Sequence, residues 1–132
     1  MADKINAIDK RLIFTRALRF GVTGLAITAL HVGVATVLIK TVLPLPALAN
    51  GLAFIVATLM SYLINSLWSF SAPLHGKSLL RFLAVSAVGF CLAVAISGLV
   101  DWYGYHYLVG IAAVALGVPP VTFLLHNFWT FR

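Results

Sequence analysis

Four long apolar stretches occupy almost the whole 132-residue chain. They lie at about residues 20–39, 46–67, 82–100 and 107–128, and none of them contains Asp, Glu, Lys or Arg. A helix needs about 20 apolar residues to cross roughly 30 Å of hydrocarbon. A mean hydropathy of +1.06, with 62% hydrophobic and only 9% charged residues, excludes an ordinary soluble domain. The sequence therefore predicts an all-α membrane protein with four transmembrane helices.

The second half of the chain repeats the first. Arg19-Phe20 begins the first apolar stretch and Arg81-Phe82 begins the third, at an offset of 62 residues. Trp68-Ser69-Phe70 ends the second stretch and Trp129-Thr130-Phe131 ends the fourth, at an offset of 61 residues. Because each repeat crosses the membrane twice, both repeats enter from the same side. This predicts two parallel two-helix repeats about an axis along the membrane normal.

The basic residues gather on one side of the predicted membrane. Only Lys40 lies on the opposite side. Since positive charge is retained in the cytoplasm, the pattern predicts that both termini and the middle loop are cytoplasmic, an N-in/C-in topology. The net charge of +6 therefore suits contact with membrane lipids that have anionic headgroups. Nucleic-acid binding is disfavoured, because no aromatic-basic surface lies outside the membrane. The clustered residues are Lys4, Lys10, Arg11, Arg16, Arg19, Lys77, Arg81 and Arg132.

The chain divides into a cytoplasmic leader at 1–18 and a membrane domain at 19–132, with repeats at about 19–70 and 81–131. Apolar residues of the leader lie near one helical face, which favours a short interfacial helix. A signal peptide cleaved after Ala47-Leu48-Ala49 is disfavoured, because the first apolar stretch exceeds the usual 7–15 residues. Cys91 is the one cysteine, so there is no disulfide framework.

Polar side chains recur near the predicted cytoplasmic ends of the second and fourth helices. Asn65 and His126 occupy equivalent positions, three residues before Trp68 and Trp129. The polar groups either hydrogen bond between helices or line a headgroup site, and the pattern leaves both interpretations open. The candidates at these ends are Ser61, Asn65 and Ser66 in the first repeat, and His126 and Asn127 in the second. Asn50 is a further candidate, because it lies within a broad common helical face with Ser61 and Asn65.

Arg19 and Arg81 stand at matching helix starts. Each either reaches the interface and anchors the topology, or offers a planar fork of donors to phosphate oxygens. With the polar groups of the second and fourth helices, two such forks predict a site for an anionic headgroup on a lipid that enters sideways. His31 lies at mid-membrane, where the other repeat has Ala93. It is interpreted as a neutral hydrogen-bonding group or a proton-coupling group.

The sequence lacks the residue patterns that are typical of enzyme active sites. There is no Ser-His-Asp set, carboxylate pair or glycine-rich phosphate loop, and the four histidines lack metal-ligand spacing. The sequence predicts neither catalysis nor a metal or other cofactor. Pro119-Pro120 predicts a kink in the fourth helix, and Gly21, Gly24 and Gly89 favour close helix approach.

Five segments, in order along the four helices, resemble the GtrA-like family. The resemblance implies a four-helix membrane protein of bacterial cell-surface polysaccharide synthesis, in the cytoplasmic (inner) membrane. Ser66 stands where many relatives have a basic residue, and His126 where the second copy commonly has Asn. The matching segments are Arg19-Phe20-Gly21-Val22-Thr23-Gly24, Leu48-Ala49-Asn50-Gly51-Leu52-Ala53-Phe54, Ser61-Tyr62-Leu63-Ile64-Asn65-Ser66-Leu67-Trp68-Ser69-Phe70, Arg81-Phe82-Leu83-Ala84-Val85-Ser86 and Phe128-Trp129-Thr130-Phe131.

The resemblance also implies a function, the flipping of polyprenyl phosphate or a polyprenyl-phosphate-linked monosaccharide. Because four helices enclose little volume, we expect a homodimer or higher homo-oligomer to complete the path. The alternative is a membrane adaptor that recruits a glycosyltransferase without transporting anything. A small multidrug exporter is disfavoured, since such exporters depend on a membrane-embedded carboxylate and the four apolar stretches contain none.

Overall fold

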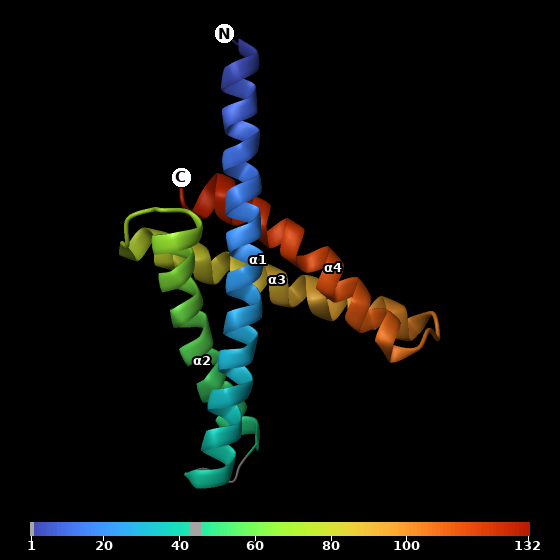
Figure 1. Cartoon of the computed structure of the whole chain (residues 1–132). Coiled ribbons are helices and arrows are strands. Elements are labelled where there is room, and N and C mark those ends of the chain that lie inside the picture. Colours follow the sequence, from blue (N-terminus) through green and yellow to red (C-terminus); the bar gives the residue numbers. More distant parts are fainter. Residues whose placement is uncertain (1, 43–45) are drawn as a thin grey trace. The chain divides into compact units, whose positions relative to one another are not determined.

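The computed structural model describes residues 2–42 and 46–132, and this part of the chain is helical without strands (Figure 1). The four α-helices are α1 (Ala2–Thr41), α2 (Pro46–Ile64), α3 (Gly76–Trp102) and α4 (Tyr107–Leu125). Two short π-helical turns, η1 (Asn65–Ser69) and η2 (His126–Thr130), continue α2 and α4. The predicted all-α fold with four long helices is confirmed.

The two sequence repeats fold as two compact units, residues 1–73 and residues 74–132. In unit 1, α1 packs along α2 and η1. In unit 2, α3 packs in the same way along α4 and η2. Figure 1 shows each unit as a helical hairpin whose two helices lie side by side. Each hairpin therefore corresponds to one repeat of the sequence.

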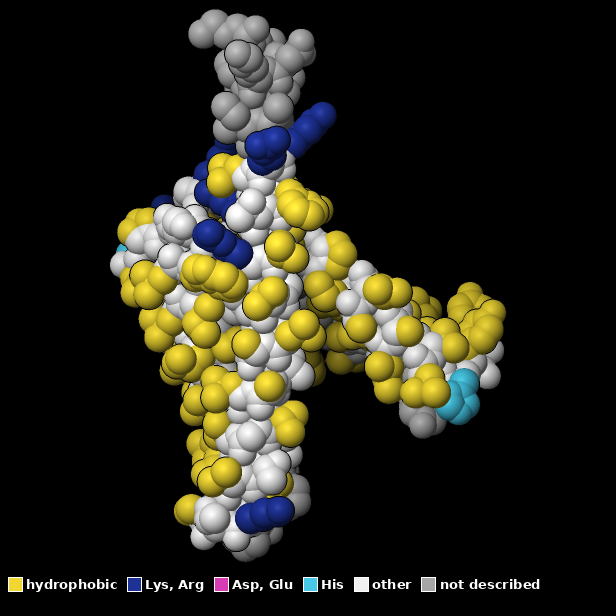
Figure 2. Space-filling model, viewed as in Figure 1, with side chains coloured by type: hydrophobic (Ala, Val, Ile, Leu, Met, Phe, Trp, Pro, Cys, Tyr) yellow, Lys and Arg dark blue, Asp and Glu magenta, His cyan; other side chains and the backbone are white. Residues whose placement is uncertain are grey.

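Lipid, and not water, is the solvent that suits the surface of these hairpins. Within the described residues, four helical segments are long and apolar enough to cross a membrane: Asp9–Thr41, Leu48–Ser69, Gly76–Trp102 and Leu108–Thr130. Large apolar side chains such as Leu25 and Leu116 are each 77% exposed. On the face seen in Figure 2, hydrophobic side chains extend along the helices, whereas the basic side chains of α1 gather mainly toward its N-terminal end. An apolar surface of this extent marks a multi-pass membrane protein.

The leader differs from its expected form, because it is continuous with the first span. Helix α1 has 40 residues, which corresponds to a length of about 60 Å at 1.5 Å per residue. The hydrocarbon core is only about 30 Å thick, so α1 is longer than one crossing requires. The turn expected around residues 41–46 includes residues 43–45, which lie outside the described chain.

Histidines at the N-caps define where the helices of unit 2 begin. The Nδ1 atom of His75 accepts a hydrogen bond from the backbone N–H of Ser78 at 3.0 Å, and the Ser78 hydroxyl donates to the His75 carbonyl at 2.9 Å. His106 Nδ1 accepts from the backbone N–H of Leu108 at 3.4 Å. The two bonds to the imidazole Nδ1 atoms satisfy backbone N–H groups that have no partner within the first turn of a helix.

Close helix approach occurs in unit 2 at one of the predicted glycines. A Cβ atom added to Gly89 would lie 2.9 Å from Cγ2 of Thr122 on α4, so a larger side chain would require Thr122 or its helix to shift. At Gly21 and Gly24, none of the described atoms lies within 4 Å of such a Cβ. The prediction is thus confirmed for Gly89, and within unit 1 it is wrong for Gly21 and Gly24. The kink expected at Pro119-Pro120 stays a prediction, and both prolines lie inside α4.

The N-in/C-in topology that the basic residues predict can be tested by labelling. In a Cys91→Ala background, single cysteines at Lys10 and Lys77 should react with a membrane-impermeant maleimide only from the cytoplasmic side. A cysteine at Gly104, in the turn between α3 and α4, should react only from the other side. The reason is the eight-to-one distribution of basic residues in the sequence. Labelling of positions 10 and 104 from the same side would contradict the four-helix topology.

Candidate functional site

Each hairpin ends its second helix in a π-helical turn, at the same place in the repeat. In unit 1 the Phe70 N–H donates to the Asn65 carbonyl at 2.9 Å, and in unit 2 the Phe131 N–H donates to the His126 carbonyl at 3.1 Å. Both bonds connect residues five apart, as a π turn requires. Such turns are rare and frequently occur at functional sites. The apolar periodicity of the sequence contains no signal that predicts them.

An arginine from the first helix of each hairpin caps this turn. Arg19 Nη1 donates to the Trp68 carbonyl at 3.0 Å, and Arg81 Nη1 donates to the Trp129 carbonyl at 2.9 Å. In both units the guanidinium carbon lies 5.5 Å from the centroid of the same tryptophan ring. The last carbonyls of a helix carry its negative dipole end, which favours a cation there. The arginines therefore connect the two helices of each hairpin.

The capping contact leaves most of each guanidinium available. Arginine has five N–H donors, and among the described residues the carbonyl uses one of them in Arg19 and in Arg81. Both side chains are half-buried, so a ligand can still reach them. Arg16, which was not among the predicted site residues, also belongs to this end of unit 1, since its Nη2 donates to the Phe70 carbonyl at 3.5 Å. Its position three residues before Arg19 places both on neighbouring turns of α1.

The polar residues of unit 1 form a buried cluster at η1. The Asn65 side-chain amide donates to the Ser61 hydroxyl at 3.2 Å. The hydroxyls of Thr23 and Ser69, neither of which was among the candidates, lie 3.2 Å apart. Two groups, Asn65 Oδ1 and the Ser66 hydroxyl, are buried without a hydrogen-bond partner in the described chain. Leaving a buried polar atom unsatisfied costs about 1–3 kcal/mol, so each of these two atoms calls for an explanation.

The equivalent residues of unit 2 are used for packing inside their own hairpin. The His126 ring stacks on Phe82 with centroids 4.5 Å apart and an angle of 17° between the planes. Its Nδ1 lies 3.0 Å from the Thr130 hydroxyl. His126 is 3% exposed and Asn127 is 8% exposed. The two repeats therefore share the arginine cap but differ in the polar cluster behind it.

Two predicted site residues lie far from the capped turns. Asn50 is exposed near the start of α2, and 15 residues of helix separate it from Asn65, or roughly 22 Å. His31 is half-buried on α1, roughly 18 Å along the helix from Arg19. Among the described residues His31 has no hydrogen-bond partner. The structure thus gathers Arg19, Ser61, Asn65 and Ser66 in unit 1, and Arg81, His126 and Asn127 in unit 2.

The shared arginine cap coincides with the limits of a family match. The model of the family described as GtrA/DPMS, transmembrane domain, matches residues 19–131, so it begins at the first capping arginine and includes both π turns. The chain belongs to the GtrA/DPMS transmembrane-domain family. Membership in the GtrA/DPMS family places it among membrane proteins connected with polysaccharide and glycan synthesis. Searches of curated proteins and of solved structures gave no match.

No metal-binding cluster accompanies this site. In the part of the chain that the structure describes, no group of three or more His, Cys, Asp or Glu side chains is arranged to hold a metal ion. The groups at the capped turns are guanidinium donors, amide and hydroxyl oxygens and an imidazole. Guanidinium groups suit phosphate oxygens, and neutral oxygens and hydroxyls suit sugar hydroxyls.

Proposed function

We propose that this protein moves polyprenyl phosphate, or a monosaccharide attached to polyprenyl phosphate, across the bacterial cytoplasmic membrane. Family membership supports a role in glycan synthesis. The lipid-facing surface of the hairpins suits a substrate whose tail stays in the bilayer while its headgroup crosses. We assign no chemical step to the protein, because the capped turns hold no carboxylate that could serve as acid or base.

The observation that carries the proposal is the pair of buried, unsatisfied polar atoms at η1, beside an arginine with donors to spare. Phosphate oxygens can bind the half-buried Arg19 guanidinium directly. Asn65 is 2% exposed and Ser66 is 0% exposed, so a headgroup reaches these two residues only when η1 opens. Asn65 Oδ1 would then accept a hydrogen bond from a headgroup hydroxyl, and Ser66 could donate or accept one. In this proposal phosphate binds to Arg19 first, and the headgroup reaches Asn65 and Ser66 after the π turn has opened.

Partners follow from the same proposal. Four helices provide little internal volume, and each unit is only one hairpin. A homodimer or higher homo-oligomer would enclose a path that a single copy does not, and symmetric assembly is the common solution. A glycosyltransferase that makes or uses the lipid-linked sugar is a natural second partner. The competing function is that of an adaptor, which would bind such an enzyme and move no lipid.

Reconstitution tests the proposal directly. Purified protein in liposomes should transfer fluorescent polyprenyl-phosphate glucose, polyprenyl phosphate, or both between leaflets faster than protein-free liposomes do. The amount of lipid in the outer leaflet is measured by chemical quenching from outside. Equal rates with and without protein, together with stable capture of a glycosyltransferase, would favour the adaptor.

A substitution at Asn65 separates transport from packing. Asn65→Leu removes the unsatisfied Oδ1 and the bond to Ser61, and membrane hydrogen bonds average only about 0.6 kcal/mol. Thermal stability should therefore change little or rise, whereas the transport rate should fall about 2- to 10-fold if a headgroup hydroxyl uses this oxygen. Thr58→Val, a half-buried polar position two turns earlier on α2, is the control and should leave both unchanged. Normal transport with lower stability would make Asn65 a packing residue.

A further inference from the structure

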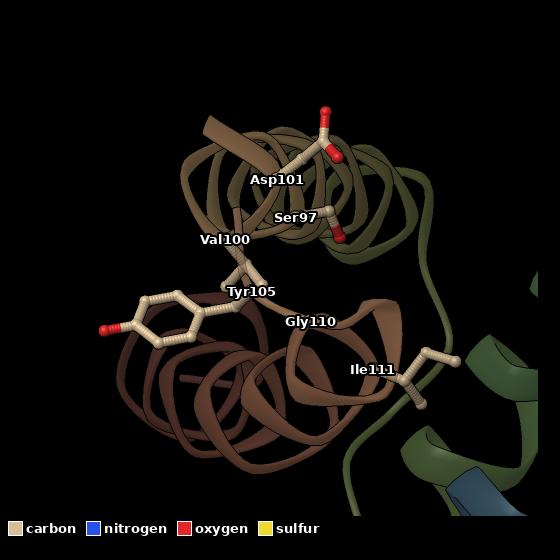
Figure 3. Close-up of a pocket in the computed structure, with 6 residues that line it drawn as sticks. All are labelled: Ser97, Val100, Asp101, Tyr105, Gly110 and Ile111. Atoms are coloured by element: carbon tan, nitrogen blue, oxygen red, sulfur yellow. The ribbon is translucent and has the colours of Figure 1, made fainter. Parts of the chain in front are cut away.

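Unit 2 has a second polar feature, at the end of its hairpin opposite to the arginine cap. A pocket of about 260 Å³ lies where the end of α3 meets the start of α4 (Figure 3). Ser97, Val100 and Asp101 border it from α3, Tyr105 from the turn, and Gly110 and Ile111 from α4. Ligand sites are typically about 300–1,000 Å³, so this volume suits one small group and not a large ligand.

Two hydrogen-bonding side chains border this pocket. Ser97 and Asp101 are four residues apart on α3, and in Figure 3 the Ser97 hydroxyl lies nearer to α4, whereas the Asp101 carboxylate points away from α4. The Tyr105 hydroxyl points away from both side chains, so Tyr105 borders the pocket without adding a polar atom to this pair. A Cβ atom on Gly110 would lie 3.6 Å from Val100 Cγ1, and the glycine thus forms part of the pocket wall.

Both side chains are exposed, and neither has a hydrogen-bond partner among the described residues. The Asp101 carboxylate also has no ion-pair partner among them. Other helical hydroxyls, such as those of Thr28 and Thr36, donate to the carbonyl four residues earlier, and Ser97 does not. Asp101 also lies in the last turn of α3, where the negative end of the helix dipole disfavours a carboxylate.

The repeat acts as an internal control. At the shared offset of 62 residues, Ser97 corresponds to Ala35 and Asp101 corresponds to Ile39. Ala35 is buried and Ile39 is half-buried in unit 1. The same hairpin thus forms with two apolar residues at these positions, and the fold does not require the polar pair. Unit 2 alone therefore presents a carboxylate and a hydroxyl at this end of its hairpin.

We propose that this pocket is a subsite for the hydroxyl groups of a neutral monosaccharide, at the end of unit 2 opposite to its arginine cap. A carboxylate offers two acceptor oxygens, and a serine hydroxyl both donates and accepts, which complements adjacent sugar hydroxyls. An unpaired carboxylate repels phosphate, so this end selects the sugar and not the phosphate. This inference rests on the proposed function and extends it, because it places a sugar contact at the end of unit 2 opposite to the arginine cap.

Binding of water-soluble sugars tests the subsite without any lipid. The purified protein, in a detergent that has no sugar headgroup, is examined by saturation-transfer NMR with glucose, galactose, mannose, arabinose, N-acetylglucosamine and glucosamine. We expect at least one neutral sugar to bind in the millimolar range. Asp101→Asn and Ser97→Ala should each weaken that binding, Asp101→Asn by about tenfold, the scale of one hydrogen bond to a charged group. Asp9→Asn, the same change on exposed Asp9 of α1, should have no effect.

Three results would overturn the subsite: no neutral sugar binds, only glucosamine binds through its ammonium group, or Asp101→Asn binds as the wild type does. A transport experiment distinguishes failure of the subsite from failure of the proposed function. In liposomes, Asp101→Asn should lower the rate at which polyprenyl-phosphate glucose is transferred between leaflets and leave the transfer rate of bare polyprenyl phosphate unchanged. An equal decrease of both rates would also contradict the subsite. If the wild type moves neither lipid, the proposed function fails, while the NMR result still decides whether the pocket binds sugar.

Discussion

Replacing Arg19 with glutamine should weaken the binding of polyprenyl phosphate by about 10- to 100-fold, the scale of one hydrogen bond to a charged group. The half-buried Arg19 guanidinium donates one hydrogen bond to the Trp68 carbonyl, and its other N–H groups can donate to phosphate oxygens. Glutamine removes both the charge and the fork of donors. Binding is measured by equilibrium titration of the detergent-purified protein with a short-chain polyprenyl phosphate.

Two variants separate phosphate binding from the capping role of Arg19. Arg19→Lys keeps the charge but loses the planar fork, so it should restore affinity only in part. Lys10→Gln removes the same charge from an exposed position on the same helix and should leave affinity close to that of the wild type. Wild-type affinity in a folded Arg19→Gln protein would limit the arginine to connecting α1 with the end of η1.

Replacing Phe82 with alanine should lower the free energy of unfolding of unit 2 by about 3–5 kcal/mol, the range for removal of a buried phenylalanine. Phe82 is 3% exposed, stacks on His126 at 4.5 Å and lies 6.3 Å from the Phe131 ring. Its loss leaves a cavity next to η2 and removes dispersion contacts that lipid cannot replace inside the hairpin. Unfolding is followed by circular dichroism during titration of mixed micelles with sodium dodecyl sulfate.

Phe90 provides the matched control for this measurement. It lies on the same helix, eight residues later, and is 66% exposed. Phe90→Ala should therefore cost less than about 1 kcal/mol, because lipid or detergent contacts replace most of what is lost. Equal destabilisation by the two substitutions would mean that the stacked cluster of Phe82, His126 and Phe131 does not hold unit 2 together.

Much of the candidate site was predictable because the chain contains its own comparison. Arg19 and Arg81 were selected by their matching positions alone, and Trp68 and Trp129 marked the ends of the two repeats. The structure brings each arginine to the tryptophan of its own repeat, at 3.0 and 2.9 Å. The sequence could not indicate this contact, because it joins an arginine side chain to a backbone carbonyl, and carbonyls are present at every residue.

Asn65 and His126 show where the repeat misleads. Their equivalent positions suggest equivalent roles, yet His126 is stacked and near Thr130, whereas Asn65 Oδ1 has no partner in the described chain. Whether a polar atom is satisfied depends on which neighbour lies within about 3 Å, and a position in a repeat does not determine that. Asn50 shares a helical face with Asn65 but lies near the other end of α2, because periodicity reports direction and not depth.

The sequence by itself determined that the chain crosses a membrane in four helices and that it folds as one hairpin twice. Both follow from properties summed over many residues, the length of apolar stretches and the recurrence of Arg-Phe and Trp-x-Phe, so no single contact can change them. Only the tertiary structure decided that the second helices end in π turns capped by arginine, that two polar atoms at η1 lack partners among the described residues, and that Ser97 and Asp101 border a pocket. These features depend on hydrogen bonds and packing at the scale of a few ångströms, which arise only when two helices of a hairpin meet.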